Sequence, residues 1–231
     1  MAKIEYQMDE HVAIVTMNDG ENRFNFPFIK AFMEILDEIE HKTDAKVLAV
    51  KSADQKIWSN GIDLGWLLPI IEKGDQNQVN SFLRELFGLM RRILLFPMPT
   101  IAAINGHAFA GGAFLSFAHD FRFMRSDRGW VCMPEVDLGM SLTPVFVALS
   151  KRAVPTHMFE EMQYTAKRLT AQECERHHII MKACPNEELM KEVLAFAKPL
   201  RKQRDIIRRM KVETHDAILA TIDREIESLS Q

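Results

Sequence analysis

Strand-like and helix-like segments alternate along the chain as far as Pro144, and this alternation restricts the fold more than any other feature. Runs rich in Val, Ile and Ala predict strands over 12–17, 47–50 and 100–104, and 121–124 is predicted as another short strand. Apolar residues at helical spacing predict amphipathic helices over 28–39 and 79–95. After Pro144 the strand signal ends and only helical patterns follow, with a capping box at Thr170 and Glu173. The pattern predicts an α/β fold with a helical C-terminal region.

The composition is that of an ordinary globular protein. With 231 residues, the chain suits one large domain or one domain with an appendage. The net charge of −3 gives no electrostatic reason to expect nucleic acid or an anionic membrane as a partner. Its three cysteines are odd in number and lack the spacing of metal ligands. We therefore expect reduced thiols, no metal site and no nucleic-acid partner.

The two ends of the sequence predict a cytoplasmic location. Charged residues run through the N-terminal stretch MAKIEYQMDEHVAIV, where a signal peptide would have an apolar core. The last residues, ESLSQ, differ from a peroxisomal Ser-Lys-Leu ending. The apolar runs, such as LLPII, are far too short to span a bilayer, so we expect no membrane partner.

A pair of adjacent glycines, Gly111 and Gly112, separates the predicted strand 100–104 from an apolar helix over 113–118. Two interpretations remain open at this point. Another group approaches the backbone closely here, or the glycines serve only a tight turn between packed elements. The stretch NGHAFAGG lacks the spacing of a dinucleotide-binding turn, so that type of site is not expected.

Four segments occur in the order and approximate spacing of one known family. They are WSNGIDL (58–64), PMPTIAAINGHAFAGG (97–112), HDFRFM (119–124) and MPEVDLG (133–139). On these segments the chain resembles the crotonase (enoyl-CoA hydratase/isomerase) superfamily and is most similar to Δ3,Δ2-enoyl-CoA isomerases of the plant-like branch. The resemblance implies a spiral core of ββα units over 1–175. It further implies that the helical C-terminal region, 176–231, serves oligomerisation as a homotrimer or hexamer.

The resemblance also implies which residues carry the chemistry. The backbone N–H groups of Gly111 and Ile62 correspond to an oxyanion hole, which stabilises the charge that builds on a thioester oxygen when a neighbouring carbon loses its proton. Glu135 corresponds to the general acid and base. Phe114 stands where hydratases of the superfamily carry a second glutamate. A single carboxylate can move a proton between two carbons, so the resemblance implies an isomerase acting on an acyl-CoA thioester, with no cofactor besides the coenzyme A of the substrate.

A further set of residues is expected to bind the substrate: Arg23, Lys56, Asn60, Gly61, Asp63, Leu64, Trp66 and Phe114. Structural roles remain open for several of them. Lys56 suits a solvated position, Asp63 suits a loop hydrogen bond, and Trp66 and Phe114 suit core packing. The cation that related proteins often carry after Asp-Leu is absent, because Gly65 stands there.

Structural roles are favoured for three further polar residues, His107, His119 and Asp120. Three other functions also remain open at this stage. The first is a catalytically silent protein that binds acyl-CoA or scaffolds a partner. The second is a hydratase of low efficiency. The third is RNA binding by the basic run 201–211.

Overall fold

The computed structural model describes residues 4–230, which build a six-stranded sheet as their main element. The strands lie in the order β1 (Ile4–Asp9), β2 (Val12–Met17), β4 (Val47–Ser52), β7 (Thr100–Ile104), β9 (Phe121–Arg125) and β11 (Lys182–Cys184). The first two form an antiparallel hairpin, and each later strand joins its neighbour in parallel. The parallel strands at 12–17, 47–52, 100–104 and 121–125 confirm the four that the sequence predicts.

Short strands outside this sheet complete a repeating unit. One small sheet contains β10 (Val131–Cys132), β8 (His107–Phe109) and β5 (Ile57–Ser59), and a second pairs β3 (Arg23–Phe24) with β6 (Gly61–Ile62). After β4 and β7, the chain leaves the main sheet, adds a strand to a small sheet and continues into a helix. These successive ββα units confirm the predicted crotonase-like spiral core.

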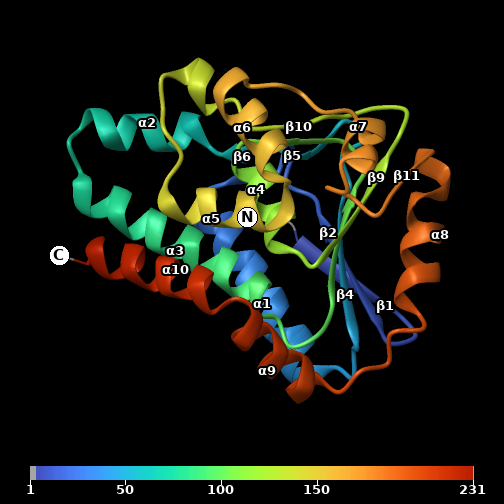
Figure 1. Cartoon of the computed structure of the whole chain (residues 1–231). Helices are drawn as coiled ribbons and strands as arrows, with labels where there is room; N and C mark the ends of the chain where they lie inside the picture. The colour runs from blue at the N-terminus through green and yellow to red at the C-terminus, as the bar shows by residue number, and fades with distance from the viewer. Residues whose placement is uncertain (1–3, 231) are drawn as a thin grey trace.

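The helices cover both faces of the main sheet. On one face lies α8 (Asn186–Ala197), and on the other lie α1 (Phe26–Lys42), α3 (Gln76–Leu94) and α4 (Gly111–Ala118) (Figure 1). Alternate residues of the central strands therefore enter two separate apolar clusters. A strand that is buried on both faces reads as a continuous apolar run, which is why these strands are recognisable from the sequence.

The C-terminal part differs from the prediction in two respects. It contains the strand β11, which pairs with β9, although the sequence predicts only helices after Pro144. It also divides the predicted last helix at His215 into α9 (Arg204–Thr214) and α10 (Asp216–Ser228). A strand of three residues is too short to show a period, and a helix break at a buried histidine has no Gly or Pro to mark it.

The remaining helices are α2 (Leu64–Glu72), α5 (Pro144–Ala153), α6 (Thr156–Thr165) and α7 (Ala171–Arg176). The capping box of Thr170 and Glu173 is present at the start of α7, as predicted. Cys132, Cys174 and Cys184 are free and buried. Within residues 4–230, no helix combines the length and the apolar character needed to cross a membrane.

The basic run 201–211 is largely engaged by its own chain. Lys211 is buried, and its Nζ lies 2.6 Å from an oxygen of Asp120 and 3.0 Å from the Met98 carbonyl oxygen. Arg204 donates to three carbonyls at the end of α1 and the loop after it. Asp120 also accepts a hydrogen bond of 2.8 Å from the Thr100 N–H, so its predicted structural role is confirmed.

The last helix packs against α3 and α5 of its own chain, where Leu219 and Ile222 are buried. On α9, by contrast, Ile206 and Met210 remain 40% and 57% exposed. We expect this exposed apolar surface to be covered by further copies in a homotrimer or a dimer of trimers. Sedimentation equilibrium should give three or six times the chain mass of 26.6 kDa, and a single species at 26.6 kDa would contradict the expectation.

Candidate active site

The glycine pair lies where two backbone segments meet. Gly61, in β6, has φ +72, and a Cβ placed on it would come within 2.4 Å of the Gly111 nitrogen. A Cβ on Gly112 would come within 2.2 Å of the Ser59 carbonyl oxygen. Neither contact is sterically possible, so both positions require glycine. Of the two interpretations that the sequence leaves open, the close approach of another backbone segment is the correct one.

The turn before α4 holds an unfavourable backbone conformation. Ala110 has φ 49 and ψ −123, a region that costs a residue with a side chain about 1–3 kcal/mol. It is held by its N–H, which donates to the Cys132 carbonyl at 3.0 Å, and by its carbonyl, which accepts from the Ala113 N–H at 2.9 Å. The strained turn starts α4 abruptly at Gly111, whose N–H therefore has no carbonyl of the preceding turn to bond with.

The N–H of Ile62 also points away from its strand neighbour. In the parallel ladder of β3 and β6, the Phe24 carbonyl accepts from the Asp63 N–H at 3.0 Å. Backbone groups alternate along a parallel strand, so the N–H of Ile62 points to the opposite side. Ile62 and Gly111 line the same cavity, which makes their two N–H groups a candidate oxyanion hole beside the positive end of α4.

This cavity has a volume of about 520 Å³ and is bordered by the small sheets, α3, α5 and the segment after Glu135. Its wall includes the following residues predicted for function: Arg23, Asn60, Ile62, Leu64, Gly111 and Glu135. The structure thus brings together all three residues predicted for catalysis and three of those predicted for substrate binding.

Glu135 is the buried acid of the cavity. It is the first residue of the 3-10 helix η1 (Glu135–Leu138). The residue is 9% exposed, and its Oε2 atom has no hydrogen-bond partner. Burial disfavours the charged form and raises the pKa of this carboxyl from 4.5 to about 7, opposed in part by a hydrogen bond from its own backbone. A carboxyl with this pKa can both accept and return a proton near neutral pH.

The other residues predicted for substrate binding lie outside the cavity wall. Asp63 caps α2 by accepting from the Trp66 N–H at 3.2 Å, so of its two possible roles it has the structural one, a loop hydrogen bond. Trp66 packs against Phe26 and Phe82 at ring distances of 5.2 and 5.1 Å. Gly61 packs against the backbone of Gly111 and does not line the cavity.

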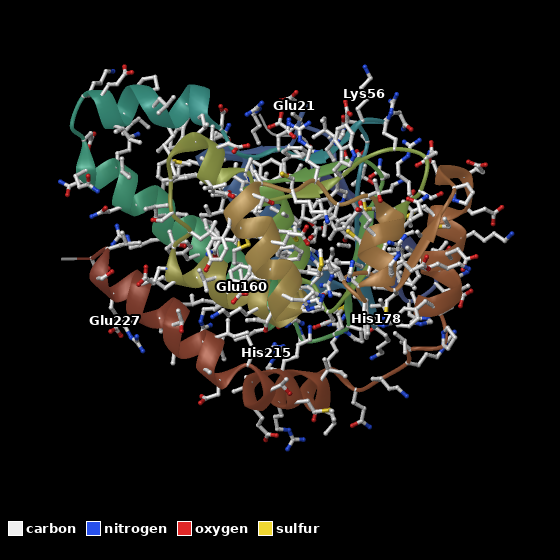
Figure 2. The ribbon with its side chains drawn as sticks, turned by 45° about the horizontal axis from the view of Figure 1, so that its top comes forward. Glu21, Lys56, Glu160, His178, His215 and Glu227 are labelled. Carbon is white, nitrogen blue, oxygen red and sulfur yellow. The ribbon has the colours of Figure 1, made fainter. Side chains whose placement is uncertain are left out.

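Lys56 and Phe114 were predicted to bind the substrate, but neither lines the cavity. Lys56 is exposed and projects away from the body of the molecule (Figure 2). Phe114 is fully buried and lies beneath Phe146, which lines the cavity in its place. The sequence cannot show that Phe146 of α5 would lie between Phe114 of α4 and the cavity.

Apolar residues that the sequence analysis did not select form one end of the cavity: Leu83, Leu138, Met140, Leu142 and Phe146. They come from α3, η1, α5 and the segment that joins η1 to α5. Leu138 ends the 3-10 helix η1, and the chain turns at Gly139, which has φ +67, before it reaches Met140 and Leu142. No single period in the sequence therefore marks these residues as one wall.

A cluster of rings and cations forms the opposite end, at the small sheets. His107 and Trp130 line the cavity with their rings 4.5 Å apart, and the guanidinium of Arg168 lies 5.5 Å from the ring centres of Trp130 and Phe109. Burial and the nearby cations Arg128 and Arg168 lower the pKa of His107. His107 is therefore neutral at physiological pH, and its Nδ1 has no partner.

Comparisons with known proteins agree with this geometry. A sequence model of the family "Enoyl-CoA hydratase/isomerase" matches residues 7–229. The chain is 33% identical over 175 residues to enoyl-CoA delta isomerase 2, peroxisomal, of Arabidopsis thaliana, covering 75% of this chain and 72% of that protein. It is 28% identical over 188 residues to a short-chain-enoyl-CoA hydratase of Clostridium acetobutylicum, covering 78% and 67%.

Solved structures give the same result for the fold. An enoyl-CoA hydratase/isomerase family protein from Pseudomonas syringae superimposes with a TM-score of 0.88 at 27% identity, covering 97% of this chain and 95% of that one. The family match extends over nearly the whole chain, and three of the four predicted segments, 58–64, 97–112 and 133–139, contribute residues to the wall of one cavity. The chain belongs to the enoyl-CoA hydratase/isomerase (crotonase) family.

Proposed function

We propose that this protein is a Δ3,Δ2-enoyl-CoA isomerase that uses Glu135 as its one acid and base. The observation that carries the proposal is a single buried carboxyl, with a pKa near neutrality, in the same cavity as two backbone N–H donors. Phe114 occupies the position of the second glutamate of hydratases, and it lies outside the cavity wall. The relative from Arabidopsis thaliana named as an enoyl-CoA delta isomerase supports this assignment.

The reaction needs only these groups. Glu135 removes a proton from the C2 carbon of the 3-enoyl-CoA, and the electrons of that bond form an enolate with the thioester carbonyl. The N–H groups of Gly111 and Ile62 hydrogen-bond the enolate oxygen as its negative charge develops. Glu135 then returns the proton to the C4 carbon, which leaves the double bond between C2 and C3. No atom is gained or lost, and no cofactor besides the coenzyme A of the substrate is used.

The two ends of the cavity suggest how the substrate lies. The acyl chain suits the apolar end, because burying methylene groups there is favourable. The coenzyme A portion suits the opposite end, where Arg23, Arg168 and Trp130 offer positive charge and an aromatic surface. Arg23 is already paired with Glu21 at 2.6 Å, so its contribution to phosphate binding is reduced. Lys56 contributes only if it folds back toward the rim.

The pKa of Glu135 predicts the pH dependence of the reaction. The base must be ionised to accept the proton, so kcat/KM should fall about tenfold per pH unit below about 7 and level off above it. Burial and the nearby cations Arg128 and Arg168 lower the pKa of His107, which shifts its titration to the acidic side of that of Glu135. The measurement is kcat/KM for a 3-enoyl-CoA from about pH 5 to about pH 9, and a flat profile would contradict the role of Glu135.

Glu135 is the one carboxyl among the described residues that line the cavity, and this predicts that hydration is slow. Adding water across a double bond usually calls for two polar groups that hold the water, and general acid–base assistance is worth about 10²–10⁴-fold. We expect crotonyl-CoA to be hydrated at least about 10²-fold more slowly than a 3-enoyl-CoA is isomerised. Equal rates would overturn this interpretation of Phe114. They would favour a hydratase, the activity for which the Clostridium acetobutylicum relative is named.

One spectrophotometric comparison tests the proposed function as a whole. Purified protein is offered 3-enoyl-, 2-enoyl- and 3-hydroxyacyl-CoA substrates in separate assays. Turnover of the 3-enoyl-CoA alone supports the isomerase. Binding of acyl-CoA without turnover of any of the three supports the catalytically silent alternative. The cytoplasmic location stays a prediction, since the Arabidopsis thaliana relative is named as peroxisomal.

A further inference from the structure

One aromatic ring on α5 forms part of the apolar wall of the cavity. Phe146, on α5, lines the cavity and is 6% exposed. Its ring lies on that of Phe114 with centres 4.2 Å apart and planes 12° apart, and Phe87 packs against it edge-on at 5.7 Å. Phe114 in turn packs against Phe117 at 6.4 Å, and both are fully buried. Phe146 is thus a rigid wall supported from behind by the core.

The next residue along α5 faces a different space. Val147 lines a second cavity of about 380 Å³, together with Gln163 and Tyr164 of α6. The segment 139–142 separates this second cavity from the first, and Glu135, Met140, Ser141 and Leu142 border both. Two neighbouring residues of one helix therefore mark the two directions in which an acyl chain could extend beyond Glu135.

We infer that Phe146, held in place by Phe114, sets the length of acyl chain that this protein accepts. The inference rests on the proposed acyl-CoA substrate. With the thioester oxygen at Gly111 and Ile62, the acyl carbons beyond the double bond run along Leu142 toward Phe146 and stop at its ring. Phe114 is a positioning residue, because its ring fixes the plane of Phe146 without touching the cavity. Phe114 stands where hydratases of the superfamily carry a second glutamate. The phenylalanine at this position therefore shapes the acyl site and also leaves the site without a second acid.

The stacked pair resists displacement for a physical reason. Stacked aromatic rings attract each other beyond the area that they bury, and a core at crystal-like density leaves no room for Phe146 to swing inward. The second cavity is a less suitable path, because the chain would have to pass the segment 139–142 and Glu135 itself. Acyl carbons beyond the length that reaches Phe146 therefore gain no further buried contact.

The test measures binding of saturated acyl-CoAs, from butanoyl- to tetradecanoyl-CoA, by isothermal titration calorimetry. For the wild type, we expect affinity to rise about fourfold per added methylene and then to stop rising at the length that reaches Phe146. In Phe146→Ala, the rise should continue for about three more carbons, since the space of the lost ring closes only in part. Val147→Ala is the matched control on the same helix, and its limit should equal that of the wild type.

Two milder variants keep the test decisive if Phe146→Ala does not fold. Phe146→Leu should extend the limit by about one carbon. Phe114→Leu removes the support of the ring and should also move the limit upward, whereas a general loss of stability would weaken all chain lengths equally. An unchanged limit in folded Phe146 variants overturns the inference. A limit that moves in Val147→Ala and not in the Phe146 variants also overturns it and places the chain in the second cavity.

The calorimetric readout separates this inference from the proposed function. If the limit moves as expected but no 3-enoyl-CoA is isomerised, the isomerase proposal fails and the chain-length inference stands. If isomerisation occurs and the limit is insensitive to Phe146, the inference alone fails.

Discussion

Replacement of Glu135 by Gln is expected to lower kcat/KM for a 3-enoyl-CoA by at least about 10²-fold, because the amide keeps the size of the side chain and cannot accept the proton. Acyl-CoA binding, measured by calorimetry, should survive. Asp137→Asn is the matched control, since Asp137 belongs to the same 3-10 helix, is exposed and lies outside the cavity wall. A Glu135→Gln enzyme with wild-type activity would remove the basis of the proposed mechanism.

The same substitution should raise stability at alkaline pH. Burial raises the pKa of Glu135 from 4.5 to about 7, so the unfolded chain releases this proton more readily than the folded one. The folded state therefore loses stability as pH rises from 4.5 to about 7, by about 3 kcal/mol in order of magnitude. Glu135→Gln removes that loss. Its melting temperature should exceed that of the wild type above about pH 7, and the gain should vanish near pH 4.5.

Replacement of Gly61 by Ala is the second change with a large expected effect. The added Cβ would lie 2.4 Å from the Gly111 nitrogen, and φ +72 disfavours any residue with a side chain. The segments that carry the two candidate donors must move apart, and loss of one oxyanion donor typically costs about 10²–10³-fold in kcat. The measurement is kcat for 3-enoyl-CoA isomerisation, with a thermal melt to detect unfolding.

Gly65→Ala is the control for the glycine substitution. Gly65 lies in α2, where a Cβ would meet only Asp63 Oδ1 at 3.4 Å, an ordinary contact. Alanine is favoured over glycine in a helix by about 1 kcal/mol, so this variant should be as stable as the wild type or slightly more so. If Gly61→Ala remains folded and fully active, Gly111 and Ile62 do not form the oxyanion hole.

The sequence could predict those parts of the fold that depend on local patterns. The buried strands over 12–17 and 100–104 are recognisable because every residue in them is apolar or small, as a strand covered on both faces requires. The order of the four family segments then identified the spiral core. The strand β11 was not predicted, because its three residues are too few to show a periodicity. They form a strand through their pairing with β9 at the edge of the sheet.

For the site, the sequence pattern predicts Glu135, Gly111 and Ile62, which lie around one cavity, because each belongs to a segment with a recognisable family pattern. The apolar wall is not predictable in this way. Phe146 is one of several apolar residues at the start of α5, and nothing in their order shows which of them faces the cavity. Phe114 and Trp66 were expected in the acyl site, yet both are packed against other rings.

The sequence by itself thus determined the class of fold, the family and the presence of one carboxyl at a position where a pair is common. These features are carried by single residues and by short-range periodicity, which do not depend on distant parts of the chain. Tertiary structure decided the rest. Whether Glu135 has a pKa near neutrality depends on what buries it. Whether Gly61 and Gly111 touch depends on how β6 packs against the start of α4, and whether Phe114 or Phe146 lines the cavity depends on how α4 packs against α5. Burial and packing arise from contacts between segments far apart in the chain, so only the folded molecule reveals them.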